Sequence, residues 1–359
     1  MNVEGSNVLK KIIPILLCPV CKDKTSQLKA HIFDGDDQQR IRDGALECKQ
    51  CRAWFPIRDY VLELIDRSLI DAGTALMVAD KFSRQVSDVG LSLTKMGLGM
   101  KAEPDNIDYS EQLAQREHFD WYADHPNADY ADYAEMPFWS AVDAVTYDYW
   151  AKFIPDSGFF LDIGCANGRS AFPLISSDRI VVGFDISRAM VVKGMQEIES
   201  KGAADKAAFF VADGSTLPFK DNIFECVQTY GVLHHLPDPG NVISEAQRVL
   251  KPGGIHLGSE NNKTAFRPIF DWMMKFVPLW HEEAGEEPLI SHAMLNDWLK
   301  DINVVKTVQT SVFIPPHLCN LVGHKFATVF VRISDQLFHS VPWIKKNGGL
   351  IVFEIRKPS

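Results

Sequence analysis

Short apolar runs alternate with longer periodic segments along the chain from residue 151 onward. The short runs are typical of buried strands. In the longer segments, such as residues 189–202 and 241–254, apolar residues recur with the period of an amphipathic helix. This alternation predicts an α/β fold with a parallel sheet. Ligands of such sheets bind beyond the carboxyl ends of the strands, so the residues that end each run are candidates for a binding site.

Polar residues and glycines end four of these runs. Asp185 ends the second run, and a carboxylate at that place can accept hydrogen bonds from both ribose hydroxyls while it repels a 2′-phosphate. The pattern therefore favours a nucleoside as the ligand. The candidate binding residues are Asp162, Gly164, Ala166 and Gly168 after the first run, Asp185 and Ile186 after the second, Asp213 and Gly214 after the third, and Tyr230 after the fourth.

The loop within residues 161–172 differs from the phosphate-binding loops of dinucleotide-binding domains. The G-x-G-x-x-G pattern requires glycine at positions 164, 166 and 169, whereas the chain has Gly164, Ala166 and Arg169. A ligand without a phosphate does not need a loop with all three of these glycines. We therefore do not expect this loop to bind a pyrophosphate.

Five segments resemble the class I S-adenosylmethionine-dependent methyltransferases: LDIGCANGR, VVGFDIS, FVADGSTLPF, FECVQTYGVLHHLPDP and RVLKPGG, in that order and spacing. The resemblance implies a Rossmann-like, seven-stranded methyltransferase sheet and S-adenosylmethionine as the cofactor. It further implies that the loop around Gly164 contacts the methionine moiety, Asp185 the ribose, Asp213 the adenine amino group, and that Tyr230 lies near the sulfonium. Ala166 stands where the family usually has glycine, so its backbone needs a negative φ or must tolerate mild strain.

Few side chains are obligatory for methyl transfer, which is an in-line displacement at a sulfonium. The protein supplies positioning, and it supplies a base where the acceptor is a hydroxyl. The candidate catalytic residues are His234 and His235 in the segment HHLPDP, and Glu260 at the end of the fifth run. Histidines of this loop also position the backbone in the family, so a structural role is the alternative for them.

Two C-x-x-C pairs near the N-terminus predict a zinc site made of Cys18, Cys21, Cys48 and Cys51. Four thiolates leave no open coordination position, so the zinc is expected to be structural. The 26 residues between the pairs exceed the usual spacing and predict an inserted hairpin, with its loop at residues 34–40. The total of seven cysteines is odd, which argues against a disulfide framework.

Residues 10–66 around these cysteines resemble the zinc-ribbon domain of the small activator subunit of tRNA and protein methyltransferases. The chain departs from that family at Tyr60, where a glycine is usual. This departure concerns the local turn and leaves the four metal ligands intact.

Residues 71–150 contain 5 basic and 15 acidic residues and many aromatic ones. We expect this segment to be an acidic, aromatic, helical linker or a lid over the cofactor and the acceptor. Packing of the aromatic side chains in a helical core is the alternative. Stacking on nucleic-acid bases is disfavoured by the negative charge of the segment.

The expected domains are a zinc ribbon at 1–70, the helical linker at 71–150 and the methyltransferase domain at 151–359, with helical insertions at 261–290 and 317–346 that would set substrate choice. The second insertion has an apolar helical stripe, which could pack on the core, lie on a membrane surface or form a dimer face. The stripe consists of Phe326, Val329, Phe330, Ile333, Leu337 and Val341, and it is flanked by Lys325, Lys345 and Lys346.

The chain has a net charge of −10 and a pI near 5.6, which makes nucleic acid an unlikely partner. No apolar run reaches the roughly 18 residues of a membrane span, so we expect a cytoplasmic protein, with peripheral membrane contact through residues 325–346 as an option. The expected reaction is methyl transfer to a small-molecule, glycan or lipid-linked acceptor, by O-methylation. The alternatives are methylation of a ribosomal RNA base, because a bacterial guanine methyltransferase also places a zinc ribbon before this core, and a non-catalytic, cofactor-binding adaptor.

Overall fold

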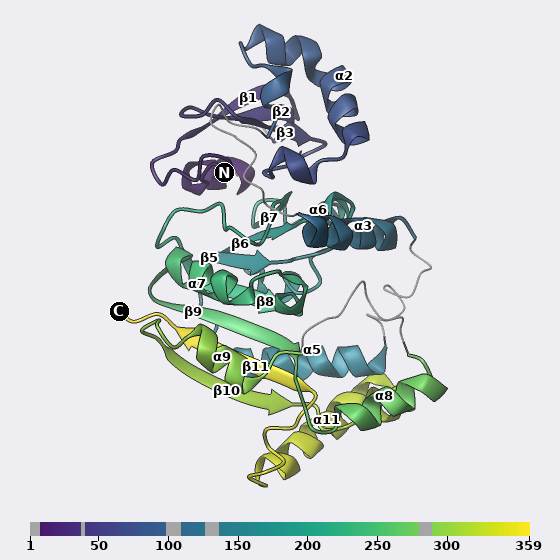
Figure 1. Ribbon diagram of the computed structural model, residues 1–359. Coiled ribbons are helices and arrows are strands. Elements are labelled where there is room, and N and C mark those ends of the chain that lie inside the picture. Colours follow the sequence, from purple (N-terminus) through teal and green to yellow (C-terminus); the bar gives the residue numbers. More distant parts are fainter. Residues whose placement is uncertain (1–7, 37–39, 98–108, 126–135, 280–288) are drawn as a thin grey trace. The chain divides into compact units, whose positions relative to one another are not determined.

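The computed structural model of the chain has two compact units (Figure 1). Unit 1 comprises Met1–Asp120 and Asp156–Phe224, and unit 2 comprises Trp121–Pro155 and Glu225–Ser359. The structure describes residues 8–36, 40–97, 109–125, 136–279 and 289–359.

Unit 1 begins with a small antiparallel sheet of four strands in the order β1-β2-β3-β4. The expected hairpin is confirmed as β1 and β2, whose residues Leu28 and Cys48 face each other in register; positions 37–39 of its loop lie outside the described residues. The strands are β1 (Leu28–Gly35), β2 (Ile41–Cys48), β3 (Trp54–Arg58) and β4 (Val61–Leu62), preceded by the helix α1 (Val8–Ile12) and the 3₁₀ turn η1 (Ile13–Ile15).

The turn between β3 and β4 needs a left-handed backbone. Tyr60, which replaces the usual glycine, has a φ of +70°, and Asp59 before it has a φ of +51°. The turn therefore keeps a glycine-like conformation without the glycine.

Helix α2 (Ala72–Asp88) follows this sheet and the turn η2 (Arg67–Leu69), and precedes η3 (Leu93–Lys95). It begins at Asp71, whose side chain accepts a hydrogen bond from the backbone N–H of Thr74 at 2.8 Å. Its buried residues, Val78, Phe82 and Val86, recur every fourth position and form one apolar face.

Parallel strands form the rest of unit 1, as the apolar runs predict. They are β5 (Gly158–Ile163), β6 (Arg179–Asp185) and β7 (Ala207–Val211), with helix α6 (Arg188–Ser200) after β6, the turn η4 (Phe172–Leu174) after β5, and helix α3 (Ser110–Asp124) earlier in the chain. Within this unit, Glu63 forms a parallel bridge with Val211 of β7. The backbone N–H of Leu64 donates to the Val211 carbonyl at 2.8 Å.

Phe209 of β7 packs against three glycines that surround it. A Cβ atom added to Gly168, Gly183 or Gly194 would lie 2.5 to 2.6 Å from the Phe209 ring. These glycines let the ring fill the space between β6, α6 and the loop after β5, because any larger residue would collide with it.

Unit 2 contains the strands β8 (Phe224–Tyr230), β9 (Leu250–Asn261), β10 (Val305–Ser311) and β11 (Leu350–Arg356). Antiparallel strands close the sheet in this unit, because β11 pairs antiparallel with both β9 and β10. Unit 2 holds its strands in the order β10-β11-β9-β8 and unit 1 in the order β5-β6-β7, which gives the seven strands expected of the second sheet.

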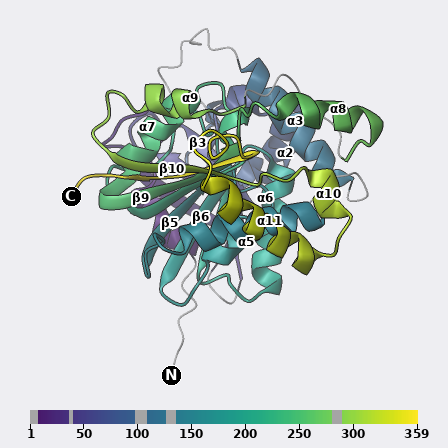
Figure 2. The same ribbon diagram turned by 90° about the horizontal axis from the view of Figure 1, so that it is seen from below.

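The helices of unit 2 include α9 (His292–Trp298). Helix α11 packs against α5, and the two views of the molecule place them side by side (Figures 1 and 2). The others are α5 (Pro137–Trp150), α7 (Pro239–Val249), α8 (Arg267–Phe276), α10 (Pro316–Asn320) and α11 (His324–His339), with the 3₁₀ turn η5 (Leu233–His235) after β8.

The two insertions carry α8 and α11, and residues 280–288 of the first lie outside the described part of the chain. The apolar stripe of α11 does not pack on the core: its buried residues are Ala327, Val331 and Ser334. The core-packing alternative is therefore wrong for this stripe. None of the described helices combines the length and apolar character needed to cross a bilayer.

Candidate functional site

Asp185 holds the loop after β5 by its side chain. Its Oδ2 accepts a hydrogen bond from the backbone N–H of Ala166 at 2.9 Å, and its Oδ1 accepts one from the backbone N–H of Ser187 at 2.9 Å. Burial raises the pKa of this carboxyl to about 6, against the lowering effect of the two backbone donors. Each carboxylate oxygen has a further lone pair, which could accept a ligand hydroxyl.

Ala166 has a φ of +44°, so the backbone takes the left-handed conformation rather than a negative φ. The mild strain expected for a non-glycine residue is therefore present here. Gly164 and Gly168 in the same loop have φ values of +69° and +89°. The loop thus keeps the left-handed backbone of a glycine-rich loop, although alanine replaces one of the glycines.

Asp162 lies at the end of β5, and its side chain is fully buried. Its Oδ2 accepts a hydrogen bond from the Ser170 hydroxyl at 2.8 Å. Cys165 between them is also buried, and burial raises the pKa of its thiol well above the ordinary value. Such a thiol stays protonated and unreactive at neutral pH.

Asp213 follows β7 and accepts the backbone N–H of Ser215 at its Oδ1, at 2.9 Å. Helix α3 reaches this loop through Gln112, whose Nε2 lies 3.5 Å from the Ser215 hydroxyl. The side-chain oxygens of Gln112 and Gln115 are buried, and neither has a hydrogen-bond partner among the described residues. Unpaired buried acceptors are rare in folded proteins, so a donor from a ligand is a natural partner for them.

The other end of α3 reaches the loop after β6. Oδ1 of Asp120 accepts the Ser187 hydroxyl at 2.6 Å and the backbone N–H of Ala189 at 3.1 Å. Arg116 binds the Leu69 carbonyl and lies 3.5 Å from Oδ2 of Asp120. Helix α3 is therefore fastened to the chain that follows both β6 and β7, where ligands of parallel sheets bind. No sequence motif pointed to the two glutamines.

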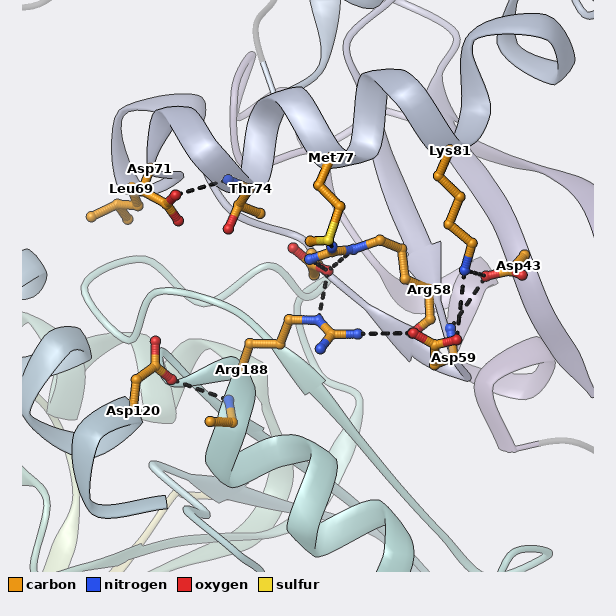
Figure 3. A network of polar contacts seen from close by, with 12 residues as sticks. Asp43, Arg58, Asp59, Leu69, Asp71, Thr74, Met77, Lys81, Asp120 and Arg188 are labelled. Carbon is orange, nitrogen blue, oxygen red and sulfur yellow. Dashed lines mark hydrogen bonds and ion pairs between the residues drawn. The ribbon is translucent and has the colours of Figure 1, made fainter. Parts of the chain in front are cut away.

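Arg188 links the N-terminal sheet to the start of α6 (Figure 3). Its guanidinium lies 3.0 Å from Oε1 of Glu63 and 3.5 Å from Oδ2 of Asp59. Glu63 also accepts from Nε of Arg58 at 2.6 Å, and both of these side chains are buried. This network of ion pairs therefore includes Arg188, which lies only three residues after Asp185 at the end of β6.

The four sequence-predicted cysteines lie together in unit 1. Their sulfur atoms are all within 4.8 Å of one another, with 3.6 Å between Cys18 and Cys51 and 3.8 Å between Cys21 and Cys48. Zn–S bonds of about 2.3 Å in a tetrahedron separate the sulfurs by about 3.8 Å. The cluster therefore fits a zinc ion.

In unit 2, Glu260 holds the turn η5 together. Its Oε2 accepts from Nδ1 of His234 at 2.7 Å, and its Oε1 accepts the backbone N–H groups of Val232 and Leu233 at 3.0 and 2.8 Å. The ring of His235 lies 4.0 Å from that of His234, measured between centroids. The three candidate catalytic residues are thus neighbours, and Glu260 is only 1% exposed.

Tyr230 of β8 is held by residues of α5. Its hydroxyl donates to Oδ1 of Asp143 at 2.6 Å, its ring stacks on Tyr147 with centroids 6.2 Å apart, and Trp150 lies edge-on at 5.8 Å. The sequence named Tyr230 as a candidate but gave no sign of Asp143 as its partner. A short hydrogen bond to a carboxylate fixes the direction of the phenol.

Two family models match the chain. Residues 161–258 match the methyltransferase domain, and residues 10–59 match the Trm112p-like protein. The chain contains a methyltransferase domain preceded by a Trm112p-like domain. The methyltransferase domain carries the predicted strand-end residues up to Tyr230 and the two histidines, and the Trm112p-like domain carries all four cysteines.

Curated relatives are similar to the methyltransferase domain. The chain is 39% identical over 95 residues to 27-O-demethylrifamycin SV methyltransferase of Amycolatopsis mediterranei (strain S699), which is 26% of this chain and 35% of the relative. It is 28% identical over 148 residues to demethylmenaquinone methyltransferase of Lactiplantibacillus plantarum, which is 38% of this chain and 62% of the relative. The chain thus covers less than two thirds of the length of either relative.

Among solved structures, the chain resembles a complex that contains the Haloferax volcanii Trm112 methyltransferase activator, at 19% identity and a TM-score of 0.47. That match covers 68% of this chain and 97% of the other. At this identity and score the likeness does not extend to function.

Proposed function

We propose that the protein catalyses methyl transfer from S-adenosylmethionine, which binds at the loops after β5, β6 and β7. The observation that carries the proposal is the chemical character of these loops. They offer the carboxylates of Asp162, Asp185 and Asp213. Helix α3 adds the amide oxygens of Gln112 and Gln115, which have no hydrogen-bond partner in the part of the chain that the structure describes. A set of acceptors suits a ligand with hydroxyls, amino groups and a sulfonium charge, and it opposes a phosphate.

The resemblance to the methyltransferase family supplies the roles of these residues. Asp185 binds the ribose hydroxyls, Asp213 binds the adenine amino group, and the loop of Gly164, Ala166 and Gly168 contacts the methionine moiety. Ile186 and Gly214 flank the two aspartates and complete the cofactor site. S-adenosylmethionine, when bound, supplies the methyl group on a leaving sulfonium.

His234 is the proposed general base toward the acceptor. Because Glu260 accepts the proton of Nδ1, the neutral ring has its basic lone pair at Nε2. Glu260 then acts as a positioning residue, since both of its oxygens already hold η5. His235 is the alternative candidate base. The resemblance implies that Tyr230 lies near the sulfonium, and Asp143 orients its phenol.

The proposed acceptor is a small molecule, a glycan or a lipid-linked molecule, methylated on oxygen. Two curated relatives are named for 27-O-demethylrifamycin SV and demethylmenaquinone, which supports a small-molecule acceptor. Methylation of RNA is disfavoured by the net charge of −10.

We also propose that the Trm112p-like domain binds one structural zinc ion through Cys18, Cys21, Cys48 and Cys51. Four thiolates complete the coordination shell, so the metal would stabilise the fold without taking part in the reaction.

Transfer of a labelled methyl group tests the proposed reaction. The purified chain is incubated with methyl-labelled S-adenosylmethionine and a cell extract, which is then separated into RNA, protein, lipid and small-molecule fractions. We expect label in the lipid or small-molecule fraction, and none with the His234→Ala variant if the acceptor is a hydroxyl. Label in RNA would contradict the acceptor class, and no label despite cofactor binding would support a non-catalytic adaptor.

A further inference from the structure

Unit 2 presents a row of large apolar side chains to solvent. Phe326 on α11 is 73% exposed and Trp272 on α8 is 61% exposed. We call the whole set the apolar surface, and it comprises Ile269, Trp272, Phe276 and Val277 of α8 and its end, Leu318, Leu321 and Val322 of α10 and its end, Phe326, Val329, Phe330, Ile333 and Leu337 of α11, and Trp343.

The three helices of this surface are tied together. Nε2 of His317 on α10 lies 2.8 Å from the carbonyl oxygen of Val277 at the end of α8, and its ring lies 6.1 Å from that of Phe270. Residues 321–323 join α10 to α11. Helices α8, α10 and α11 therefore form one connected part of the unit.

Helix α11 is firmly held with its apolar face outward. Its inward residues Ala327, Val331 and Ser334 are buried, and Arg332 forms an ion pair with Asp148 of α5 at 2.6 Å. Asp335 accepts the backbone N–H of Val312 at 2.9 Å. The helix thus buries its small side chains and exposes its large ones, which is the reverse of a helix that faces water.

Positive charge lies at the two ends of α11. Residues 315–347 contain Lys325, Arg332, Lys345 and Lys346 against Asp335, and Asp148 of α5 pairs with Arg332, which leaves +2 for these residues. The three lysines are exposed: Lys325 stands at the start of α11, and Lys345 and Lys346 follow its end, close in sequence to the exposed Trp343. An apolar helical face with lysines and a tryptophan at its border is typical of helices that lie in the interface of a bilayer.

We propose that the apolar surface docks the protein on a membrane that contains anionic phospholipids. The large side chains would enter the boundary between headgroups and acyl chains, and the lysines would contact the anionic headgroups. A second copy of the chain fits less well, because lysines stand at both ends of α11. Pairing two such helices in either direction would bring like charges together.

This inference extends the proposed function without resting on it. A protein at the bilayer surface could take a lipid-linked acceptor directly from the membrane. Membrane docking and methyl transfer are measured separately, so either one can fail while the other holds.

Flotation of the full chain with vesicles tests the proposal. We use vesicles of phosphatidylcholine alone and vesicles with added phosphatidylglycerol, and we expect the wild-type chain to float with the second kind. Ile333→Asp should reduce flotation at least tenfold. Lys345→Gln should reduce it about fivefold, since each lysine near an anionic surface contributes about 1 kcal/mol.

Leu76→Asp is the matched control, because Leu76 is 72% exposed on α2 and lies outside the apolar surface. It should float as the wild type does, and the thermal melts of all three variants should match the wild type because the changed side chains are exposed. A wild-type chain that never floats would overturn the proposal. So would a wild-type dimer in analytical ultracentrifugation that Ile333→Asp converts to a monomer without any vesicle binding.

Discussion

The backbone N–H of Ala166 donates to Oδ2 of Asp185 across 2.9 Å. This bond joins a left-handed residue of the loop after β5 to the carboxylate that ends β6. The strain at Ala166 and the burial of Asp185 therefore belong to one arrangement, which holds the proposed cofactor loop in place.

Replacing Ala166 by glycine should relieve the strain of its φ of +44°. We expect Ala166→Gly to raise the free energy of unfolding by up to about 1 kcal/mol, because L-residues pay roughly that amount in the left-handed region. Ala166→Val should lower it, since a β-branched residue fits that region poorly. Chemical denaturation measures both variants, and a valine variant as stable as the glycine variant would show that the residue carries no strain.

The pKa of about 6 at Asp185 predicts opposite pH dependences for stability and ligand binding. The folded chain holds this proton more tightly than the unfolded chain, so the stabilisation is present below pH 4 and is lost as the pH rises to about 6. The ionised form is the better acceptor of ribose hydroxyls, so affinity for the cofactor should increase over the same range.

Denaturation and cofactor titration at several pH values measure these two trends. In Asp185→Asn both trends should disappear, whereas Asp205→Asn, an exposed aspartate in the same unit, should keep them. A pH dependence that remains in Asp185→Asn would have to arise from another titratable group.

The Phe209 ring fills the space beside Gly194 of α6, so a larger residue at position 194 should destabilise the fold. A Cβ at this position would lie 2.6 Å from the Phe209 ring, so Gly194→Ala should lower the free energy of unfolding by about 1 to 3 kcal/mol. Gly323→Ala is the control, because no heavy atom lies within 4 Å of its added Cβ. Combining Gly194→Ala with Phe209→Leu should cost less than the sum of the two single changes, and strict additivity would rule out the collision.

Loss of one cysteine ligand should release the proposed zinc. Cys48→Ser should contain less than one zinc per chain and should melt earlier, because structural zinc binding is coupled to folding. Cys226→Ser is the control, since Cys226 is buried in β8, outside the four-cysteine cluster. Elemental analysis decides the question, and wild-type protein that is folded and free of metal would contradict the zinc assignment.

The bond between Glu260 and His234 predicts a change in the pH profile of the reaction. Glu260→Gln removes the negative charge beside the imidazole, so the pKa of His234 should fall and the acidic limb of kcat/KM should move to lower pH. A purely structural role for Glu260 would lower activity by a similar factor at every pH.

The sequence predicts those site residues that belong to a local motif or stand at the end of an apolar run. The four cysteines are confirmed as a cluster, and the candidate residues of the parallel strands stand at the strand ends where the apolar runs placed them. These predictions succeed because the pairs of cysteines and the ends of the strands follow from local spacing alone.

Other features depend on packing between distant segments. Gln112 and Asp143 lie on helices that precede the parallel strands, and no spacing shows that they reach Ser215 and Tyr230. The period of α11 predicts an apolar face but not its direction, because inward and outward faces have the same spacing.

A calorimetric titration of the full chain with S-adenosylmethionine tests the central claim most directly. The account predicts saturable binding of one molecule per chain, at least tenfold weaker in Asp185→Asn and unchanged in Asp205→Asn, because only the first variant loses a proposed ribose acceptor. The absence of binding to the wild-type chain, or equal affinity in Asp185→Asn, would contradict the account.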